Sequence, residues 1–274
     1  MATRAWLGTE SNNGQTAGNW SGGAVPIAGD AIVGDARAQR ALEAGTDFSG
    51  ILFTDVHFHS DYPYALGSSG SPFKVRCAEL LWAGQGAAFL NAAGGSVSRA
   101  IIDTDAIEAV TMADNSGAFT KIEWLKGRGS IFALTNIDLL FVTYRDNPPF
   151  DSRVTLQPLN GIDAIHQNAG TLISQAAVAH PLIVLSGGLF EIQESGFGAG
   201  TVATAVHQSG GVMRYRQFDE GSVITNYYHH GGYIDVEGTT ATQHVITNLY
   251  RFPGSEIPKR DMLNIANEFK IGVP

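Results

Sequence analysis

The sequence predicts an all-β chain that winds as a single parallel β-solenoid. Glycine supplies 33 of 274 residues, about 12%, against an average near 7%. Charged residues make up 16% of the chain, against about 25% in an ordinary soluble domain. Short apolar runs separated by Gly, Asn, Ser and Asp predict many short strands, and an internal repeat predicts that these strands stack on one another.

The repeat is clearest in the second half of the chain. The segments VATAVHQSGG, VITNYYHHGG and VITNLYRFPG begin at Val202, Val223 and Val245, with offsets of 21 and 22 residues. An earlier copy, AIHQNAG at 164–170, lies about two periods before 205–211. A period of about 21 residues with glycine corners is typical of a β-solenoid, in which each turn of chain is a rung that buries its inner face by stacking on the next.

Equivalent residues of successive rungs are expected to form columns. Phe190, Met213 and Ile234 fall at one apolar position after the corner, and polar residues alternate with the apolar ones. We expect an inward valine column, a threonine ladder, and a third column whose side the pattern leaves open. These are, in order, Val202, Val223 and Val245; Thr204, Thr225 and Thr247; and His207, Tyr228 and Tyr250.

The chain divides into an N-terminal arm and cap (1–45), the β-solenoid (46–253) and a tail (254–274). Within the cap, Asp35 to Ala44 has a helical composition. In the tail, Met262, Ile265 and Phe269 stand at i, i+3 and i+7, which predicts a short amphipathic helix or arm. The tail either folds back on the last rung or reaches a partner subunit.

Charge and targeting exclude several classes of protein. The net charge is −9 and no basic stripe occurs, so we expect no binding to nucleic acid or to an anionic membrane. No apolar run is long enough to span a membrane, and the first residues lack a signal peptide, so we expect a protein made in a cytoplasm. The single cysteine, Cys77, fits a buried structural thiol.

Two residue groups invite a chemical interpretation. His57, His59 and Asp61 alternate, so on a strand all three would face one way as metal ligands do, although a solvent-facing or interface strand explains them better. Asp103 and Asp105, with Glu108 nearby, form the one dense acidic group that a polysaccharide-cleaving β-helix would need. No nucleophile motif and no recurring acidic site accompanies them, so we expect no catalytic residues, no cofactor and no enzyme activity.

The segment 19–30, NWSGGAVPIAGD, with Trp6 upstream, resembles the opening of bacteriophage virion proteins. Several of these are trimeric β-solenoids that decorate or cement the capsid, and the same opening occurs in secreted bacterial β-solenoid adhesins. The missing signal peptide favours the phage branch. The side chains of Trp6 and Trp20 are large enough to cover the open end of the first rung.

The resemblance implies a non-enzymatic virion structural protein. We expect a capsid decoration (cement) protein that stabilises the phage head as a homotrimer, with the major capsid protein and copies of itself as partners. It would be assembled in the host cytoplasm and located on the capsid surface of the virion. Trp6, Trp20, Met262, Ile265 and Phe269 are the cap and interface candidates. The alternative is a tail fibre or tailspike component that binds or degrades host polysaccharide.

Overall fold

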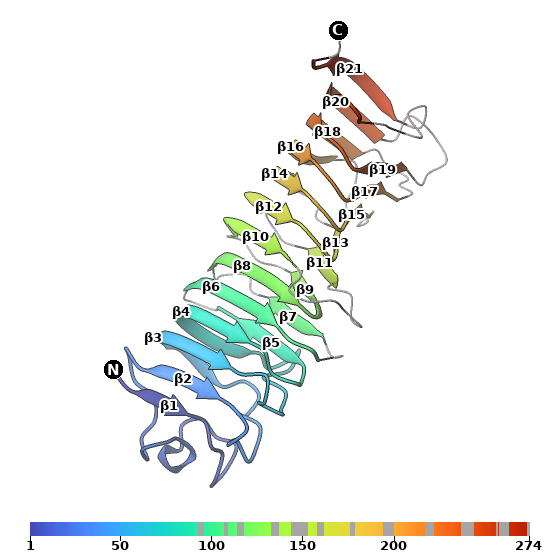
Figure 1. Cartoon of the computed structure of the whole chain (residues 1–274). Coiled ribbons are helices and arrows are strands. Elements are labelled where there is room, and N and C mark those ends of the chain that lie inside the picture. Colours follow the sequence, from blue (N-terminus) through green and yellow to red (C-terminus); the bar gives the residue numbers. More distant parts are fainter. Residues whose placement is uncertain are drawn as a thin grey trace. The chain divides into compact units, whose positions relative to one another are not determined.

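The fold prediction is confirmed: the chain is an all-β parallel β-solenoid of about 8 turns with roughly 22 residues per turn (Figure 1). The computed structural model describes residues 1–92, 96–106, 109–113, 118–132, 137–143, 153–157, 162–175, 179–193, 200–216, 222–236, 244–255, 257 and 263–272. Within these residues the only helical segment is a single 3₁₀ turn, η1 (Ala17–Asn19).

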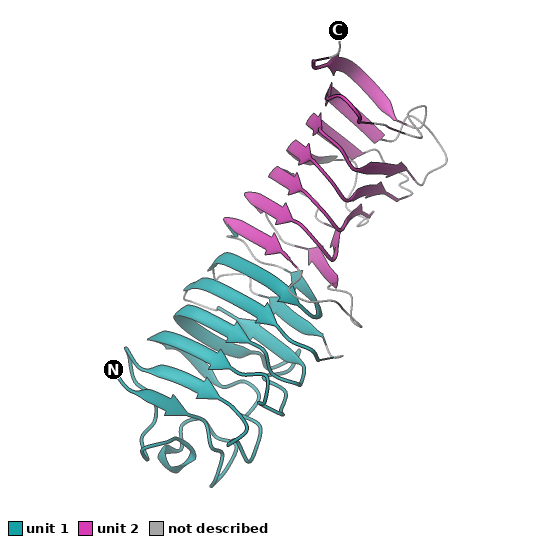
Figure 2. Ribbon diagram, viewed as in Figure 1, with its two compact units in different colours: residues 1–137, 145–151 teal, residues 138–144, 152–274 magenta. Residues whose placement is uncertain are grey.

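The strands fall into two compact units, the first with β1 to β9 and the second with β10 to β21 (Figure 2). The strands of unit 1 are β1 (Thr3–Ala5), β2 (Ala31–Gly34), β3 (Asp47–Phe58), β4 (Phe73–Trp82), β5 (Ala88–Asn91), β6 (Ser96–Asp103), β7 (Val110–Ala113), β8 (Ala118–Lys126) and β9 (Arg128–Phe132). On one face the strands pair in parallel in the order β1, β2, β3, β4, β6, β8, and β5, β7 and β9 form a second sheet face.

Unit 2 has the same plan. Its strands are β10 (Leu139–Val142), β11 (Arg153–Gln157), β12 (Ala164–Gln167), β13 (Thr171–Ser174), β14 (His180–Leu185), β15 (Leu189–Ile192), β16 (Gly200–Gln208), β17 (Val212–Tyr215), β18 (Ser222–His229), β19 (Tyr233–Val236), β20 (His244–Arg251) and β21 (Asn264–Lys270). One face contains β10, β12, β14, β16, β18, β20 and β21, and the other contains β11, β13, β15, β17 and β19.

Each unit has a core made of columns of stacked side chains. In unit 1 a fully buried column follows the register of the first face, and unit 2 has an equivalent column of its own. The two columns are Ile32, Val56, Leu80, Ala100 and Ile122 in unit 1, and Leu140, Ile165, Ile183, Val206, Tyr227 and Leu249 in unit 2. Burying one apolar residue per turn against its equivalents supplies the hydrophobic free energy that a single rung lacks.

The strands after the glycine corners lie as predicted. Phe190, Met213 and Ile234 are in register and fully buried, and the polar residues between the apolar positions face outward in register as well. The corner glycines adopt a left-handed backbone, for example Gly211 at φ 66°. A Cβ atom on Gly211 would lie 2.7 Å from the carbonyl oxygen of Gly188 one turn away, so the stacked corners need glycine for space as well as for φ.

The predicted inward valine column is wrong. Val223 and Val245 are half-buried, and the residues that follow them, Ile224 and Ile246, are fully buried in register with Ala203. A bulge separates Thr201 from Ala203 in the pairing of β16 with β18, so Val202 falls outside the register altogether. The larger isoleucine side chains fill the interior. The prediction chose the valines because a pattern of apolar residues does not distinguish valine from isoleucine, although the two differ in volume.

The predicted helices are also wrong. The tail residues Asn264–Lys270 form the strand β21, in parallel register with β20, and Asp35 to Ala44 forms turns and bends. Ile265 continues the column of Ile246, and Phe269 continues the column of Tyr250. The tail is therefore a further copy of the repeat, NIANEFK against VITNLYR, in which the apolar positions happen to match a helical spacing as well. Met262 lies outside the described residues.

We predict that Ile224→Ala destabilises the protein by about 2–5 kcal/mol, because it opens a cavity in a fully buried column. The matched control is Val223→Ala on the same strand, where the half-buried side chain limits the loss to about 1 kcal/mol or less. Urea unfolding followed by circular dichroism measures both. Equal losses for the two variants would contradict the orientation of β18.

Candidate binding faces

A ladder of stacked rings runs along the outside of unit 2. The column whose side the sequence left open, His207, Tyr228 and Tyr250, faces outward and continues to Phe269. Successive ring centroids lie 4.3, 4.6 and 5.0 Å apart, with interplanar angles of 7°, 8° and 15°. The rings stack because parallel pairing places equivalent residues one strand spacing apart, close to the distance that stacked aromatic rings prefer.

The same column extends over the earlier strands of unit 2. Phe141 of β10 is in register with His166 of β12, with ring centroids 5.1 Å apart, and Val184 of β14 joins His166 to His207. A second pair of rings, His230 and Phe252, stacks at 3.8 Å. This extension was not predicted from the sequence. The repeat could be recognised only after residue 160, and Phe141 and Val184 differ in residue type, so nothing in the sequence assigns them to one column.

An amide ladder lies beside the rings. Asn248 donates from Nδ2 to Oδ1 of Asn226 at 3.0 Å, and Asn267 donates to Oδ1 of Asn248 at 3.1 Å. Asn248 therefore has a donor and an acceptor satisfied by its neighbours in the ladder, whereas Asn226 only accepts and Asn267 only donates within it. The three asparagines continue a column that begins with apolar residues. In order it contains Leu139, Ala164, Leu182, Ala205, Asn226, Asn248 and Asn267.

The second face of unit 2 carries a charged column instead. Glu191, Arg214 and Asp235 are in register on β15, β17 and β19. Arg214 donates from Nε to Asp235 at 2.9 Å, and its Nη1 lies 3.6 Å from the carboxylate of Glu191. Arg216 approaches the same carboxylate at 3.0 Å, so the almost completely buried Glu191 has two cationic partners. Alternating signs allow charges to stack at the spacing of one rung.

Unit 1 has an ionic network on its first face. Arg99 of β6 forms a bidentate pair with Glu123 of β8, at 2.7 and 3.0 Å, and also contacts Glu79 of β4 at 2.7 Å. His57 of β3 lies 3.1 Å from Glu79, and Lys121 lies 2.6 Å from Glu123. The hydrogen bonds from Arg99 lower the pKa of Glu123 from 4.5 to about 2. Each of these carboxylates therefore has a cationic partner, and the contact with Arg99 favours the ionised form of Glu123.

The three weak candidates for metal ligands, His57, His59 and Asp61, do not share one face of a strand. Strand β3 ends at Phe58, and the carbonyl of His59 accepts a hydrogen bond from Tyr62 at 3.0 Å, so His59 and Asp61 lie in a turn where the alternation of a strand no longer holds. His57 pairs with Glu79 instead. Within the part of the chain that the structure describes, no three His, Cys, Asp or Glu side chains gather closely enough to hold a metal ion.

The described part of the acidic group at 103–108 lies beside Lys126. Asp105 pairs with Lys126, Asp103 is in register with that lysine at the end of β6, and Glu108 lies outside the described residues. The fully buried Cys77 has a pKa raised to about 12 by burial, so it is protonated at neutral pH and unreactive.

The two tryptophans proposed as a cap are both buried in unit 1. Trp6 and Trp20 form an antiparallel bridge, and their rings meet edge to face at a centroid distance of 5.1 Å. Each indole N–H donates to a backbone carbonyl at 2.8 Å, Trp6 to Arg40 and Trp20 to Gly14. Phe48 of β3 packs against Trp20 at 6.2 Å, which connects the N-terminal segment to the core of the rungs that follow.

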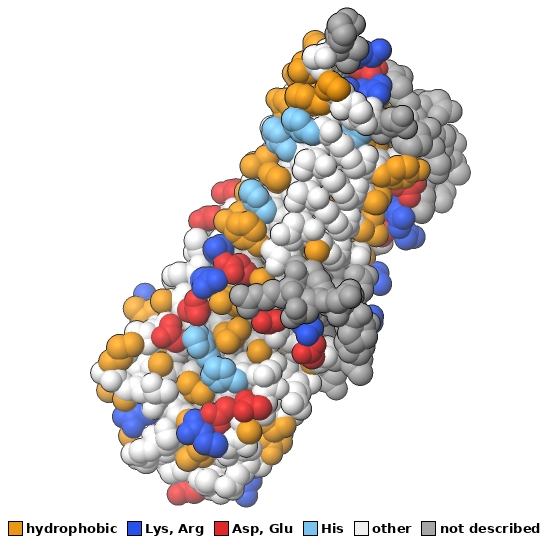
Figure 3. Space-filling view, viewed as in Figure 1, with side chains coloured by type: hydrophobic (Ala, Val, Ile, Leu, Met, Phe, Trp, Pro, Cys, Tyr) orange, Lys and Arg blue, Asp and Glu red, His pale blue; other side chains and the backbone are white. Residues whose placement is uncertain are grey.

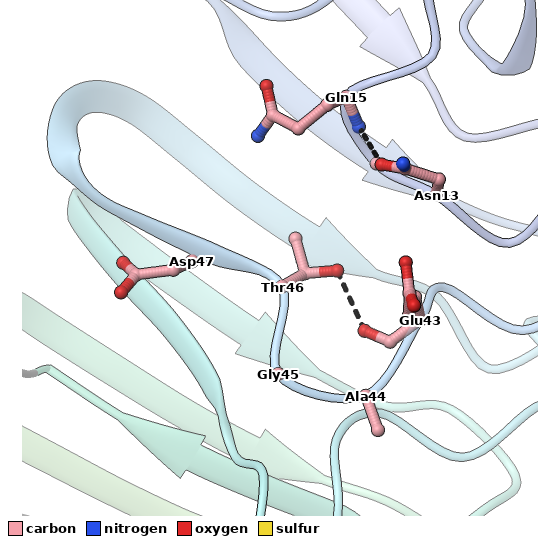
Figure 4. Close-up of a pocket in the computed structure, with 8 residues that line it drawn as sticks. Asn13, Gln15, Glu43, Ala44, Gly45, Thr46 and Asp47 are labelled. Atoms are coloured by element: carbon pink, nitrogen blue, oxygen red, sulfur yellow. Dashed lines mark hydrogen bonds between the residues drawn. The ribbon is translucent and has the colours of Figure 1, made fainter.

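One polar pocket of about 370 Å³ opens beside these tryptophans, between the loop of Asn13 to Gln15 and the segment Glu43 to Asp47 (Figure 4). Thr46 donates to the carbonyl of Glu43 at 2.7 Å, and Asn13 accepts from the backbone N–H of Gln15 at 2.7 Å. These bonds form the turns of the two loops. Asp47 pairs with Lys74 at 3.4 Å.

Comparisons of the chain with protein-family models, curated proteins and solved structures give no match. The function must therefore be inferred from the faces themselves. Among the described residues no helix has the length and apolar character needed to cross a membrane.

Of the three histidines buried inside unit 2, His180, His229 and His244, two have a serine hydroxyl beside the ring. His180 accepts a hydrogen bond at Nδ1 from the backbone N–H of Ile162 at 3.0 Å, and its Nε2 lies 3.2 Å from Oγ of Ser174. The Nδ1 of His244 lies 2.9 Å from Oγ of Ser222. Burial lowers the pKa of both rings to about 4, because the interior disfavours the imidazolium.

We predict that acid destabilises the protein between pH 6.5 and 4. Below pH 6.5 these histidines bind protons in the unfolded chain but stay unprotonated in the folded one. The stability present above pH 6.5 is therefore lost as the pH falls towards 4, and the loss for His180 amounts to at most about 3 kcal/mol. Urea unfolding at a series of pH values measures the loss. In His180→Asn, whose amide oxygen still accepts from Ile162, the slope should be smaller, whereas an unchanged slope would contradict the assignment.

Proposed function

We propose that the protein is a non-enzymatic virion structural protein, a capsid decoration (cement) protein that stabilises a phage head as a homotrimer. The resemblance at 19–30 supports the proposal from the sequence. The observation that carries it is a broad outward face without charge on unit 2, in a chain whose net charge is −9 (Figure 3). A face of this kind favours contact with other protein surfaces over contact with water.

The arrangement of the carboxylates supports a role without catalysis. Hydrolysis of a glycoside needs one carboxyl group that can hold a proton and a second that is ionised, on either side of the bond. In the described charged clusters, Glu79, Glu123 and Glu191 each contact an arginine instead. These ion pairs occupy hydrogen-bonding positions on the carboxylates that a substrate would otherwise use.

The ring ladder argues against the alternative of a polysaccharide-binding tail component. Sugars stack on the faces of aromatic rings, and here the faces of Tyr228 and Tyr250 are covered by the neighbouring rings of the same column. The column therefore offers ring edges to a ligand. Edges and amides suit a packed protein interface better than a sugar platform.

Two exposed apolar residues mark a contact element in unit 1. Ile27 is 63% exposed and Leu52 is 48% exposed. The backbone N–H of Gly29 donates to the carbonyl of Leu52 at 2.9 Å, so the loop that carries Ile27 lies against the strand that carries Leu52. We assign the capsid contact to this pair. A protein that binds only the assembled shell stabilises it by mass action, in proportion to the logarithm of its free concentration over the dissociation constant.

We predict that the purified protein binds empty capsids of the phage whose genome encodes it. Cryo-electron microscopy should show density at fixed sites on the shell, and saturating protein should raise the temperature at which the capsids rupture. Ile27→Asp should weaken binding at least tenfold, because it places a charge in the apolar contact. Asn12→Asp adds the same charge at an exposed site of unit 1 and should bind like the unaltered protein.

The absence of any binding to capsids would contradict the proposal. The release of reducing ends from host polysaccharide by the purified protein would replace it with the enzymatic alternative.

A further inference from the structure

We infer that copies of this chain associate side by side through one face of unit 2, the uncharged face. This face consists of the two outward columns on β10, β12, β14, β16, β18, β20 and β21. The first column is Leu139, Ala164, Leu182, Ala205, Asn226, Asn248 and Asn267, and the second is Phe141, His166, Val184, His207, Tyr228, Tyr250 and Phe269. The inference takes the homotrimer from the proposed function and adds the surface that forms it.

Charge separates this face from the others. Neither of its two columns, of seven residues each, contains Asp, Glu, Lys or Arg. The second face of the same unit carries Glu191, Arg214 and Asp235 in register. Two carboxylates, Asp138 and Asp163, lie at the margin just before β10 and β12. In a chain of net charge −9, two copies repel one another over most of their surface, and a neutral face is where they approach at the lowest electrostatic cost.

The side chains of the face are suited to being buried. Most are half-buried already, and Phe269 is 43% exposed. The amides of the asparagine ladder satisfy one another along the column, so covering them leaves fewer polar groups without a partner than covering unpaired amides would. Figure 3 shows hydrophobic and histidine side chains gathered along one side of unit 2. Aromatic residues with few charges are the composition of an interface core.

The periodicity of the face identifies the occupant as a second copy. Its rows of side chains repeat at the spacing of the strands, close to 4.8 Å, over seven strands. Ridges and grooves of one spacing fit together along their whole length only with a surface of equal spacing, and another β-solenoid of this kind presents one. A glycan or an unrelated protein surface matches such rows at a few points only.

The test is the mass of the protein in solution. Sedimentation equilibrium of the full chain at micromolar concentration should give three times 29.1 kDa. Asn248→Asp changes the shape of the face hardly at all but adds a charge on β20, and Val184→Lys adds one on β14. Both should dissociate to the mass of one chain, with at least a tenfold weaker association constant. Tyr233→Glu, on the second face and 41% exposed, adds the same kind of charge and should leave the trimer intact.

Circular dichroism and thermal unfolding of each variant establish that unit 2 is folded. A single-chain mass for the unaltered protein overturns the inference, and so does a trimer that survives both face variants or dissociates equally in Tyr233→Glu. Binding of a glycan by a monomer, abolished in Asn248→Asp, overturns it as well and assigns the face to a carbohydrate. Capsid binding by a monomer would support the proposed cement role and overturn this interface. A trimer that does not bind capsids would support this interface and contradict the cement role.

Discussion

Each strand of this molecule pairs in parallel with its equivalent one turn away, and this pairing places every side chain directly beside the residue that holds the same position in the next turn. A residue is therefore compatible with the fold only when it tolerates its own equivalents at a distance close to 4.8 Å. Apolar side chains meet this condition inside the rungs, as the fully buried column ending in Tyr227 and Leu249 shows. Outside the rungs, stacked rings, asparagine ladders and alternating charges meet it in three different ways.

The composition of the chain follows from the same constraint. Equal charges in register repel, and in unit 2 Arg214 has an opposite charge above and below it in Glu191 and Asp235. Columns of uncharged side chains avoid this repulsion, which fits a sequence in which charged residues are only 16%. The corners obey the rule too. A side chain at Gly211 would collide with the corner of the previous turn, so glycine recurs there.

The sequence predicted the parts of this fold that one repeat unit specifies by itself. The period, the glycine corners and the inward apolar positions of β15, β17 and β19 were legible because strict alternation of apolar and polar residues marks them. The orientation of β18 could not be predicted in this way. Thr225 and Asn226 are adjacent and both face outward, which breaks the alternation. The ion pairs of Arg99 were not predicted either, since they join residues 20 and 24 positions apart whose register only the structure supplies.

The last described strand of unit 2, β21, bears on the proposed association through a side face of this unit. A strand paired on one edge is a template for another strand, and a solenoid must prevent its own extension. In β21 the inward position that Leu249 holds in β20 is taken by Glu268, which pairs with Arg251 at 3.1 Å. A further apolar strand stacked there would remove this carboxylate from water, and the apolar contacts of the new strand would not offset the desolvation free energy. The last described residue of the interior column is thus charged, whereas the outer columns stay uncharged as far as Asn267 and Phe269. The proposed contact with a second copy therefore uses the face along the strands and not the edge of β21.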